Sequence, residues 1–247
     1  MNSYLSLAPV YDALTGDVDY SAFADFYEKV FVKEDVQVQT VLDLGCGTCT
    51  LTEEMAKRGY EMIGVDASDE MLMVASEKFA AGEYKFEPLL LNQSMEELDL
   101  YGTVDAAVSC LDSLDYVEPE ALPEVFRRLM LFIRPGGVFV FDVNTPEKLR
   151  GLDGEVFIDE TDDVYCVWRA EFDEEENAIF YGMDIFSRSG DKWERDFEEH
   201  IEYAHSAEML TDMLEKAGFK NVKVYGELSF EAPRDGEQRI FITAVRP

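Results

Sequence analysis

The fold is decided by the stretch Val41-Leu42-Asp43-Leu44-Gly45-Cys46-Gly47-Thr48-Cys49-Thr50. Its apolar start is typical of a buried strand, the two glycines indicate a tight turn, and the polar residues after them can open a helix. Glycine lets a backbone approach a ligand closely, and free amides at a helix start favour an anionic group. The stretch therefore predicts a strand, a ligand-binding turn and a helix.

Strands and helices alternate on both sides of this turn. Asp66 ends the next apolar run about 20 residues after Gly45, the spacing at which an acidic residue binds the ribose of an adenosine. Alternation of this kind predicts an α/β fold: a doubly wound, Rossmann-like, mostly parallel sheet of seven strands. The expected strands of this sheet are 40–44, 60–65, 85–91, 104–109, 138–143, 222–228 and 238–245, and the expected helices are 50–58, 69–79, about 119–132 and 206–217.

The first 35 residues predict two short helices, Tyr4–Leu14 and Ser21–Val32, because apolar side chains recur at three- and four-residue spacing. These helices are either a packing extension or a lid over a cofactor.

Residues 151–203 interrupt the alternation. They predict an inserted antiparallel meander, because runs of aromatic and β-branched residues are separated by polar turns. The expected strands are 156–158, 164–172, 178–188 and 193–203, and the insert carries 18 acidic against four basic residues. We therefore expect a cofactor-binding domain made of residues 1–150 and 204–247, and a lid or substrate subdomain made of residues 151–203.

Charge limits the partners of this protein. The 247 residues include 53 Asp and Glu against 21 Lys and Arg, a net charge of −32. Binding to nucleic acid or to an anionic membrane needs basic side chains, so a small-molecule substrate is favoured. We expect no targeting segment, and the sequence has no apolar run of about 20 residues and only four cysteines. We expect a cytoplasmic monomer or homodimer.

The combination of Asp43, the Gly45–Gly47 turn and Asp66 resembles motifs I and post-I of the class I S-adenosylmethionine-dependent methyltransferases. The resemblance continues at Tyr11–Leu14 and over the sheet regions of residues 1–146 and 206–247, including Ser109–Tyr116 and Ile133–Gly137. It implies a methyltransferase with S-adenosylmethionine as cofactor and S-adenosylhomocysteine as product.

The resemblance also implies roles for single residues. Asp43 faces the methionine ammonium, the glycine turn meets the methionine half, and Asp66 holds the ribose hydroxyls. Met71 covers the adenine or packs in the core. The implied cofactor contacts are Tyr11, Asp43, Gly45, Cys46, Gly47, Asp66, Ala67, Met71, Ser94, Met95, Cys110 and Asp112. Two departures predict weaker cofactor binding: Cys49 replaces a common third glycine, and Ser94 replaces a common aspartate.

The methyl acceptor is expected at the carboxyl ends of the strands, beside the glycine turn. No catalytic residue is fixed by the sequence, and the candidates are Asp112, Tyr116, Asn144 and His200, with Asp115, Thr145 and His205 nearby. Asp112 is expected to contact the acceptor or the cofactor; the alternative is that Asp112 or Ser113 caps a helix. His200 and His205 are either bases or structural residues.

Several alternatives remain at this point. Cys46-Gly47-Thr48-Cys49 is also a C-x-x-C pattern, typical of a redox pair, but redox use leaves Asp43 and Asp66 unexplained. A nicotinamide-binding domain needs a third glycine where Thr50 stands. No metal site is expected, since Cys110 and Cys166 stand alone. The alternative functions are a catalytically silent cofactor-binding sensor or partner module, and an RNA or protein methyltransferase.

Overall fold

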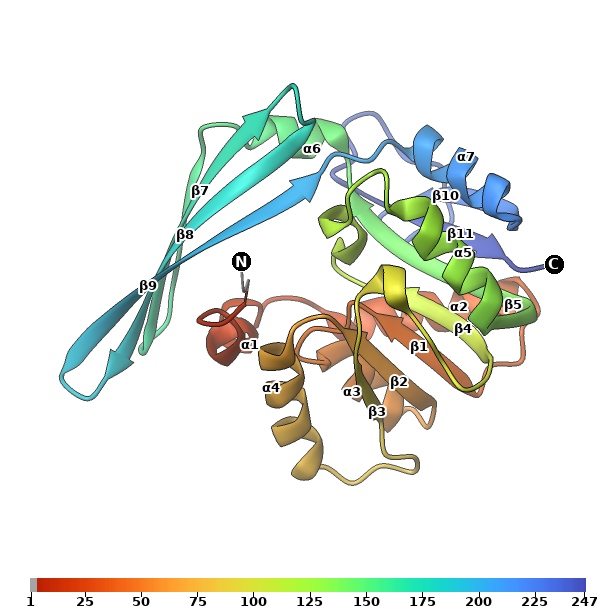
Figure 1. The fold of residues 1–247 in the computed structure, drawn as a ribbon, viewed down its shortest axis with the longest axis horizontal. Helices are drawn as coiled ribbons and strands as arrows, with labels where there is room; N and C mark the ends of the chain where they lie inside the picture. Colours follow the sequence, from red (N-terminus) through yellow and green to blue (C-terminus); the bar gives the residue numbers. More distant parts are fainter. Residues whose placement is uncertain (1–3) are drawn as a thin grey trace.

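A computed structural model describes residues 4–247 as two sheets (Figure 1). The larger sheet has seven strands in the order β10-β11-β5-β4-β1-β2-β3. Neighbouring strands are parallel except β11, which runs antiparallel to both of its neighbours. The predicted doubly wound, mostly parallel sheet is confirmed. Its strands are β1 (Thr40–Leu44), β2 (Glu61–Asp66), β3 (Leu89–Asn92), β4 (Val104–Ser109), β5 (Ile133–Asn144), β10 (Lys220–Gly226) and β11 (Arg239–Val245).

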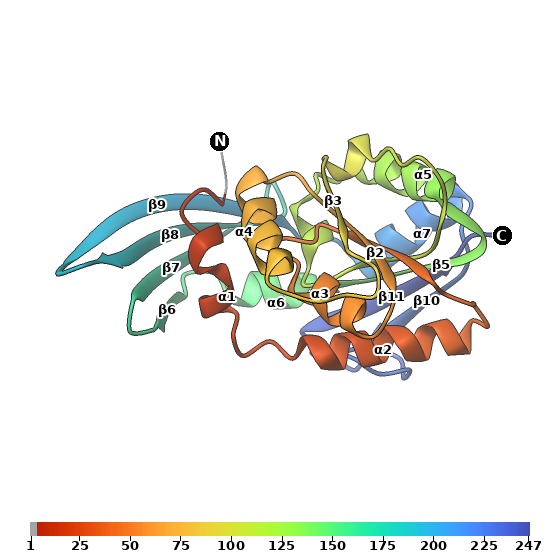
Figure 2. The same ribbon diagram turned by 90° about the horizontal axis from the view of Figure 1, so that it is seen from below.

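Helices cover both faces of this sheet, so its central strands are apolar on both sides. Figure 2 shows α2 (Tyr20–Lys33) and α3 (Thr50–Lys57) on one face, opposite α5 (Leu122–Phe132) and α7 (Ala207–Ala217). The helix α4 (Asp69–Ala80) follows β2. The strand order reverses between β1 and β4, where open α/β sheets bind ligands at the carboxyl ends.

Several predicted boundaries differ from the structure. The segment 4–14 forms a 3-10 turn, η1 (Ala8–Val10), followed by α1 (Tyr11–Leu14), because Pro9 lacks the amide that a continuous helix needs. The third strand starts at Leu89, and α5 starts at Leu122. The fifth strand, expected at 138–143, starts at Ile133, so residues 134–137 lie within β5, where the register with β4 shifts.

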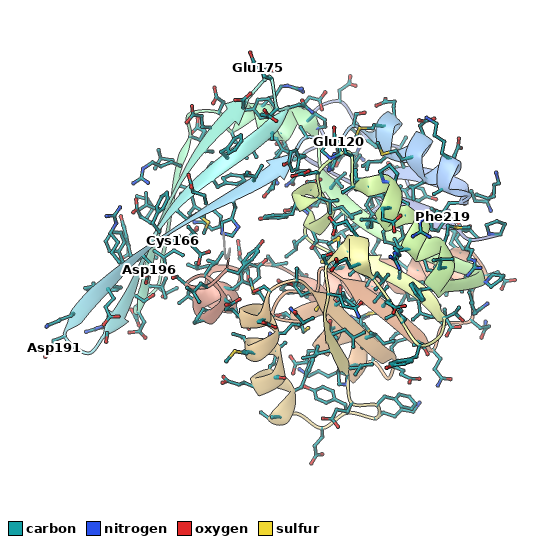
Figure 3. All side chains as sticks on the ribbon, in the orientation of Figure 1. Glu120, Cys166, Glu175, Asp191, Asp196 and Phe219 are labelled. Atoms are coloured by element: carbon teal, nitrogen blue, oxygen red, sulfur yellow. The ribbon has the colours of Figure 1, made fainter. Side chains whose placement is uncertain are left out.

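The second sheet is antiparallel, in the order β6-β7-β8-β9, as the sequence predicted. A short helix that the sequence analysis missed, α6 (Pro146–Gly151), leads from β5 into it. In Figure 3, Asp191 marks the far tip of this meander and Glu175 marks the turn at its other end. The strands are β6 (Val156–Glu160), β7 (Val164–Asp173), β8 (Ala178–Ser189) and β9 (Lys192–Tyr203).

One face of the meander is packed and the other faces solvent. The side chains of Ile179, Met183 and Ile185 on β8 are buried, together with Leu7 of the N-terminal segment. Residues on the opposite face, such as Phe180 of β8 and Phe197 of β9, are exposed. The buried face therefore turns toward the N-terminal segment. Within residues 4–247, no helix has both the length and the apolar character needed to cross a membrane.

Candidate functional site

The turn after β1 is built around two glycines with different constraints. Gly45 has φ +74°, and a Cβ there would lie 2.6 Å from Met95 Cε and 2.7 Å from Ser113 Cβ. Gly47 has φ +53°, but no heavy atom lies within 4 Å of its would-be Cβ. Gly45 is thus required by close packing, whereas Gly47 leaves the backbone open on one side.

Asp43 lies at the end of β1 beneath this turn and is 1% exposed. Its Oδ2 accepts a hydrogen bond of 2.5 Å from Thr52 Oγ1, and its Oδ1 has no partner. Burial raises its pKa to about 7, and the charge of Asp66 adds to that effect. A buried, unpartnered carboxylate oxygen favours a cationic ligand group beside it.

Asp66 lies at the end of β2, next to the same turn. Its Oδ2 accepts from the Gly47 amide at 2.8 Å and its Oδ1 accepts from the Ser68 amide at 2.9 Å. Burial raises the pKa of this carboxyl group. Asp66 therefore joins the glycine turn to the start of α4, where the Ser68 side chain accepts from the Met71 amide.

The N-terminal segment is tied to the glycine turn through Asp12. Its Oδ1 accepts from Thr48 Oγ1 at 2.5 Å and from Thr50 Oγ1 at 3.2 Å, and its Oδ2 pairs with Lys78 at 2.8 Å. The turn, the N-terminal segment and the loop after β4 together line a cavity. Its lining residues are Tyr11, Tyr20, Asp43, Gly45, Cys46, Gly47, Thr48, Thr50, Leu51, Cys110, Leu111 and Ser113.

The loop after β4 closes against the glycine turn. Ser113 Oγ donates to the carbonyl oxygens of Gly45 at 3.1 Å and Cys110 at 2.8 Å. Leu111 and Asp112 both adopt a left-handed backbone, with φ +54° and +52°. This tight loop places Asp112 directly beside the cavity-lining residues Leu111 and Ser113.

Three carboxylates meet next to this loop, and we call Asp112, Asp115 and Glu202 the acidic cluster. One oxygen from each lies within 4.8 Å of the others. Asp115 is 0% exposed. Its Oδ2 accepts from the backbone amide of Asn144 at 2.9 Å, and its Oδ1 has no partner. Asn144 Nδ2 donates to Glu202 Oε2 at 3.1 Å. Burial and then the charge of Asp112 raise the pKa of Glu202 to about 8.

Arg239 holds the acidic cluster to the sheet. Its guanidinium pairs with Asp112 at 2.5 Å and with the fully buried Asp142 of β5. The Asp142 carboxylate also accepts from the amides of Leu111 and Asp112. The Asp112 side chain forms this ion pair and makes no capping hydrogen bond, so the alternative that Asp112 caps a helix is wrong.

Sequence reasoning missed Arg239, Asp142 and Glu202. Asp142 carried a signal, because a carboxylate inside an otherwise apolar strand must find a partner. Glu202 stands in a strand with many other charged residues, and Arg239 is the first residue of its strand, directly after a polar loop, so nothing in the sequence distinguishes them from solvent-facing positions.

The remaining expected cofactor residues are placed as follows. Met95 contacts the glycine turn, Met71 is 2% exposed within α4, and Ser94 immediately precedes the short η2 helix (Met95–Glu97). Ala67 is exposed between β2 and α4. Cys110 is buried and lines the cavity.

Cys46 and Cys49 point into the sheet. Their sulfur atoms lie 3.0 Å and 3.2 Å from the position that a Cβ on Gly64 would take. Cys49 starts α3 with φ +63°, the left-handed backbone that glycine adopts easily. Burial, with Cys49 beside it, raises the pKa of Cys46 well above the usual range. A redox pair needs a lowered thiol pKa, so this geometry opposes the C-x-x-C alternative.

The two histidines occupy different environments. His200 is buried, with Nε2 3.1 Å from Glu198 Oε2 and its ring 4.7 Å from that of Tyr4. The Tyr116 ring lies 6.2 Å from the His200 ring. His205 Nε2 instead lies 3.0 Å from the Val117 carbonyl oxygen, and burial lowers its pKa. The structure thus places the His200 ring beside the Tyr116 ring, whereas His205 contacts the main chain at Val117.

Comparisons with known proteins agree with this geometry. Residues 41–137 match a family described as "Methyltransferase domain". The "Putative methyltransferase YqeM" of Bacillus subtilis is 28% identical, over 98% of this chain and 97% of that protein. The crystal structure of an S-adenosylmethionine-dependent methyltransferase from Clostridium acetobutylicum is 29% identical, with a TM-score of 0.86 over 99% of each chain. The amino pentose methyltransferase CalS10 from Micromonospora echinaspora shares the fold, with a TM-score of 0.76 at 18% identity, over 100% of this chain and 99% of that one.

Proposed function

This chain is a class I S-adenosylmethionine-dependent methyltransferase, and from that premise we propose that it methylates a small-molecule acceptor. The cofactor supplies an electrophilic methyl group on a sulfonium. The protein's part is to bind both reactants, align the acceptor with that methyl and remove a proton where the acceptor carries one.

The residues at the glycine turn fit the methionine half of this cofactor. Oδ1 of Asp43 is buried without a partner and suits an ammonium group. The open side of Gly47 suits close approach of a ligand to the backbone. Tyr11, Cys46 and Cys110 line the same cavity. We infer that these residues hold the methionine half.

The nucleoside half would lie toward β2 and β3. Each oxygen of Asp66 accepts one backbone hydrogen bond and keeps a further lone pair for ribose hydroxyls. We propose that Ala67, Met71, Ser94 and Met95 surround the adenine, as their positions after β2 and β3 favour. Ser94 offers the adenine amine a hydroxyl in place of a carboxylate, which predicts modest affinity.

The acceptor would bind at the acidic cluster. The observation that supports this placement is the hydrogen bond from Ser113 to Gly45, because it fixes the loop carrying Asp112 against the cofactor turn. Tyr116 follows in the same segment and is 38% exposed, so an acceptor can reach it. We propose that the meander of residues 151–203 acts as the substrate subdomain, contributing His200 and Glu202 to this site, while residues 1–150 and 204–247 bind the cofactor.

A small acceptor is favoured over RNA by the state of the basic side chains. Arg58 pairs with Asp25, Glu28 and Glu54. Arg127 and Arg128 both pair with Glu124. The adjacent basic pairs 57–58 and 127–128 are thus largely neutralised, and phosphate binding needs cations that are free to replace counterions. All four cysteines are free, which suits the reducing cytoplasm in which we place the enzyme.

Transfer of a labelled methyl group tests this proposal. The enzyme is incubated with methyl-labelled S-adenosylmethionine in three separate reactions. They contain a small-metabolite extract, total RNA or total protein as the source of the acceptor. We expect label in the metabolite fraction only. Label confined to RNA or protein would contradict the small-molecule acceptor, and no label in any fraction would favour the catalytically silent sensor.

A further inference from the structure

The acidic cluster concentrates negative charge where little solvent reaches. The cluster consists of the three carboxylates of Asp112, Asp115 and Glu202. A fourth carboxylate, that of Asp142, pairs with the same arginine, Arg239, as Asp112 does. Arg239 therefore has two carboxylates to neutralise, which leaves the cluster short of positive charge. Repulsion between buried like charges is costly unless a further cation or protons offset it.

One further cation lies near the cluster, but it does not reach the carboxylates. Lys148 Nζ donates to the side-chain oxygen Oδ1 of Asn144 at 2.6 Å. The side-chain nitrogen Nδ2 of the same residue donates to Glu202. The Lys148 charge thus acts on Glu202 through Asn144.

Asp115 provides independent support for a missing ligand. Its side chain is completely buried, and Oδ1 has no hydrogen-bond partner. The Asp115 carboxylate is one of the three that converge, so this unpartnered oxygen belongs to a side chain of the cluster itself. Native proteins rarely leave such an oxygen unpaired, and a ligand donor would satisfy it.

Aromatic rings lie beside these carboxylates. Tyr4 and Tyr116 have ring centroids 6.2 Å apart, and both rings lie beside the ring of His200. Tyr116 directly follows Asp115 of the acidic cluster in the chain, and burial of its hydroxyl, Tyr4 and the charges of Glu202 and Asp112 raise its pKa. Aromatic faces next to carboxylates favour an organic ammonium group.

We propose that the acidic cluster binds the protonated amine of the methyl acceptor, so that the atom methylated is a nitrogen. This inference rests on the proposed function and adds the substrate class: a small molecule that carries a primary or secondary amine. Oδ1 of Asp115 accepts one N–H bond, Glu202 accepts another, and Tyr116 covers the apolar part next to the nitrogen.

The chemistry balances with the groups present. The ammonium first gives one proton to Glu202, which leaves a neutral amine with a free electron pair. That pair forms the new C–N bond as the C–S bond breaks, and the electrons of the C–S bond remain on sulfur. The methylated nitrogen leaves as an ammonium, and Glu202 returns its proton to solvent. Because burial raises the pKa of Glu202 to about 8, its ionised form is a stronger base than an ordinary carboxylate near 4.5, and we expect it to take this proton at pH values near and above 8, where it is ionised.

The neighbours of the cluster favour an amine over a divalent metal ion. Arg239 already occupies Asp112, so a metal would have to compete with a guanidinium at one of its three ligands. Lys148 adds a second positive charge behind Asn144. A divalent metal ion brings more charge toward both cations than a singly charged amine does, and it gains nothing from the tyrosines.

The test is an NMR-detected titration of the full chain with n-butylammonium and its neutral counterpart n-butanol, with and without S-adenosylhomocysteine. We expect n-butylammonium to bind at least tenfold more tightly than n-butanol. The isosteric variants Glu202→Gln and Asp115→Asn should each weaken ammonium binding at least tenfold. Glu199→Gln, on the exposed side of β9, should leave it unchanged. Two independent variants keep the test valid if one of them fails to fold.

Several results would overturn this inference. Equal binding of the ammonium and the alcohol, no ammonium binding, or ammonium binding that survives both cluster variants would each do so. Binding of Mg²⁺ at the cluster in place of the ammonium would assign it to a metal. Binding of S-adenosylhomocysteine without ammonium binding contradicts this inference alone, whereas ammonium binding without S-adenosylhomocysteine binding contradicts the proposed function alone.

Discussion

The amide of Gly47 donates a hydrogen bond of 2.8 Å to Oδ2 of Asp66. Because Oδ1 of the same side chain accepts from Ser68, one carboxylate fixes both the turn after β1 and the start of α4. The group that we expect at the ribose is therefore held in place before any ligand arrives. Such preorganisation lowers the entropy that cofactor binding costs.

The two glycines of the turn should respond differently to substitution. Gly45→Ala places a Cβ 2.6 Å from Met95 Cε on a left-handed backbone, so we expect a loss of about 3 kcal/mol in the free energy of unfolding. Gly47→Ala meets no neighbouring atom and should lose only about 1 kcal/mol, but it should impair cofactor binding. Urea denaturation measures both variants. Equal losses in stability would contradict the different roles assigned to the two positions.

Asp43 should make stability depend on pH. Its pKa rises from 3.8 to about 7 on folding, so between these values the folded state holds a proton that the unfolded state has released. Stability contributed by the protonated form is then lost as pH rises, by up to about 1.4 kcal/mol per pH unit. We expect the wild type to lose stability relative to Asp43→Asn between pH 5 and pH 7 in urea denaturation. Parallel pH profiles for the two proteins would show that Asp43 does not titrate in this range.

Arg239 should be important for folding, because it compensates the fully buried Asp142. Arg239→Leu leaves that carboxylate buried without its cation and should cost about 3–5 kcal/mol. Adding Asp142→Asn should recover much of the loss. The control is Arg234→Leu, which removes an exposed pair with Glu231 and should cost less than about 1 kcal/mol. If the double variant is no more stable than Arg239→Leu, charge compensation is not the reason for the loss.

Glu198 should hold the N-terminal segment on the meander. Its carboxylate accepts from the amides of Tyr4 at 2.9 Å, Ser6 at 2.5 Å and Leu7 at 3.1 Å. Glu198→Gln weakens all three bonds, so hydrogen–deuterium exchange of residues 4–14 should become faster, while Glu199→Gln should leave it unchanged. The same exchange rate in all three proteins would mean that the segment is held by its apolar contacts alone.

The sheet and the cofactor turn could be predicted from the sequence because their signals are local. An apolar run, Gly45 and Gly47 specify β1 and its turn within a few residues, and the alternation of strands and helices specifies the layers. Boundaries failed where tertiary contacts decided them, as at the register shift that extends β5 back to Ile133.

The acidic cluster could be predicted only in part. Asp112 and Asp115 follow β4 directly, so topology alone places them near the cofactor turn. Glu202 comes from β9, and only the packing of the meander brings it there. The net charge of −14 in residues 151–203 therefore did not predict which acidic side chains lie at the site. Most of them are exposed, and the exceptions include the buried Glu198 and Glu202.

The central claim is that the β1 turn and Asp66 form the S-adenosylmethionine site, and calorimetric titration with S-adenosylhomocysteine tests it most directly. We predict that the wild type binds one molecule per chain, that Asp66→Ala weakens binding by about 10- to 100-fold through the loss of charge-assisted hydrogen bonds, and that Asp69→Ala, at an exposed neighbouring carboxylate, does not. No binding to the wild type, or equal binding to wild type and Asp66→Ala, would contradict this claim.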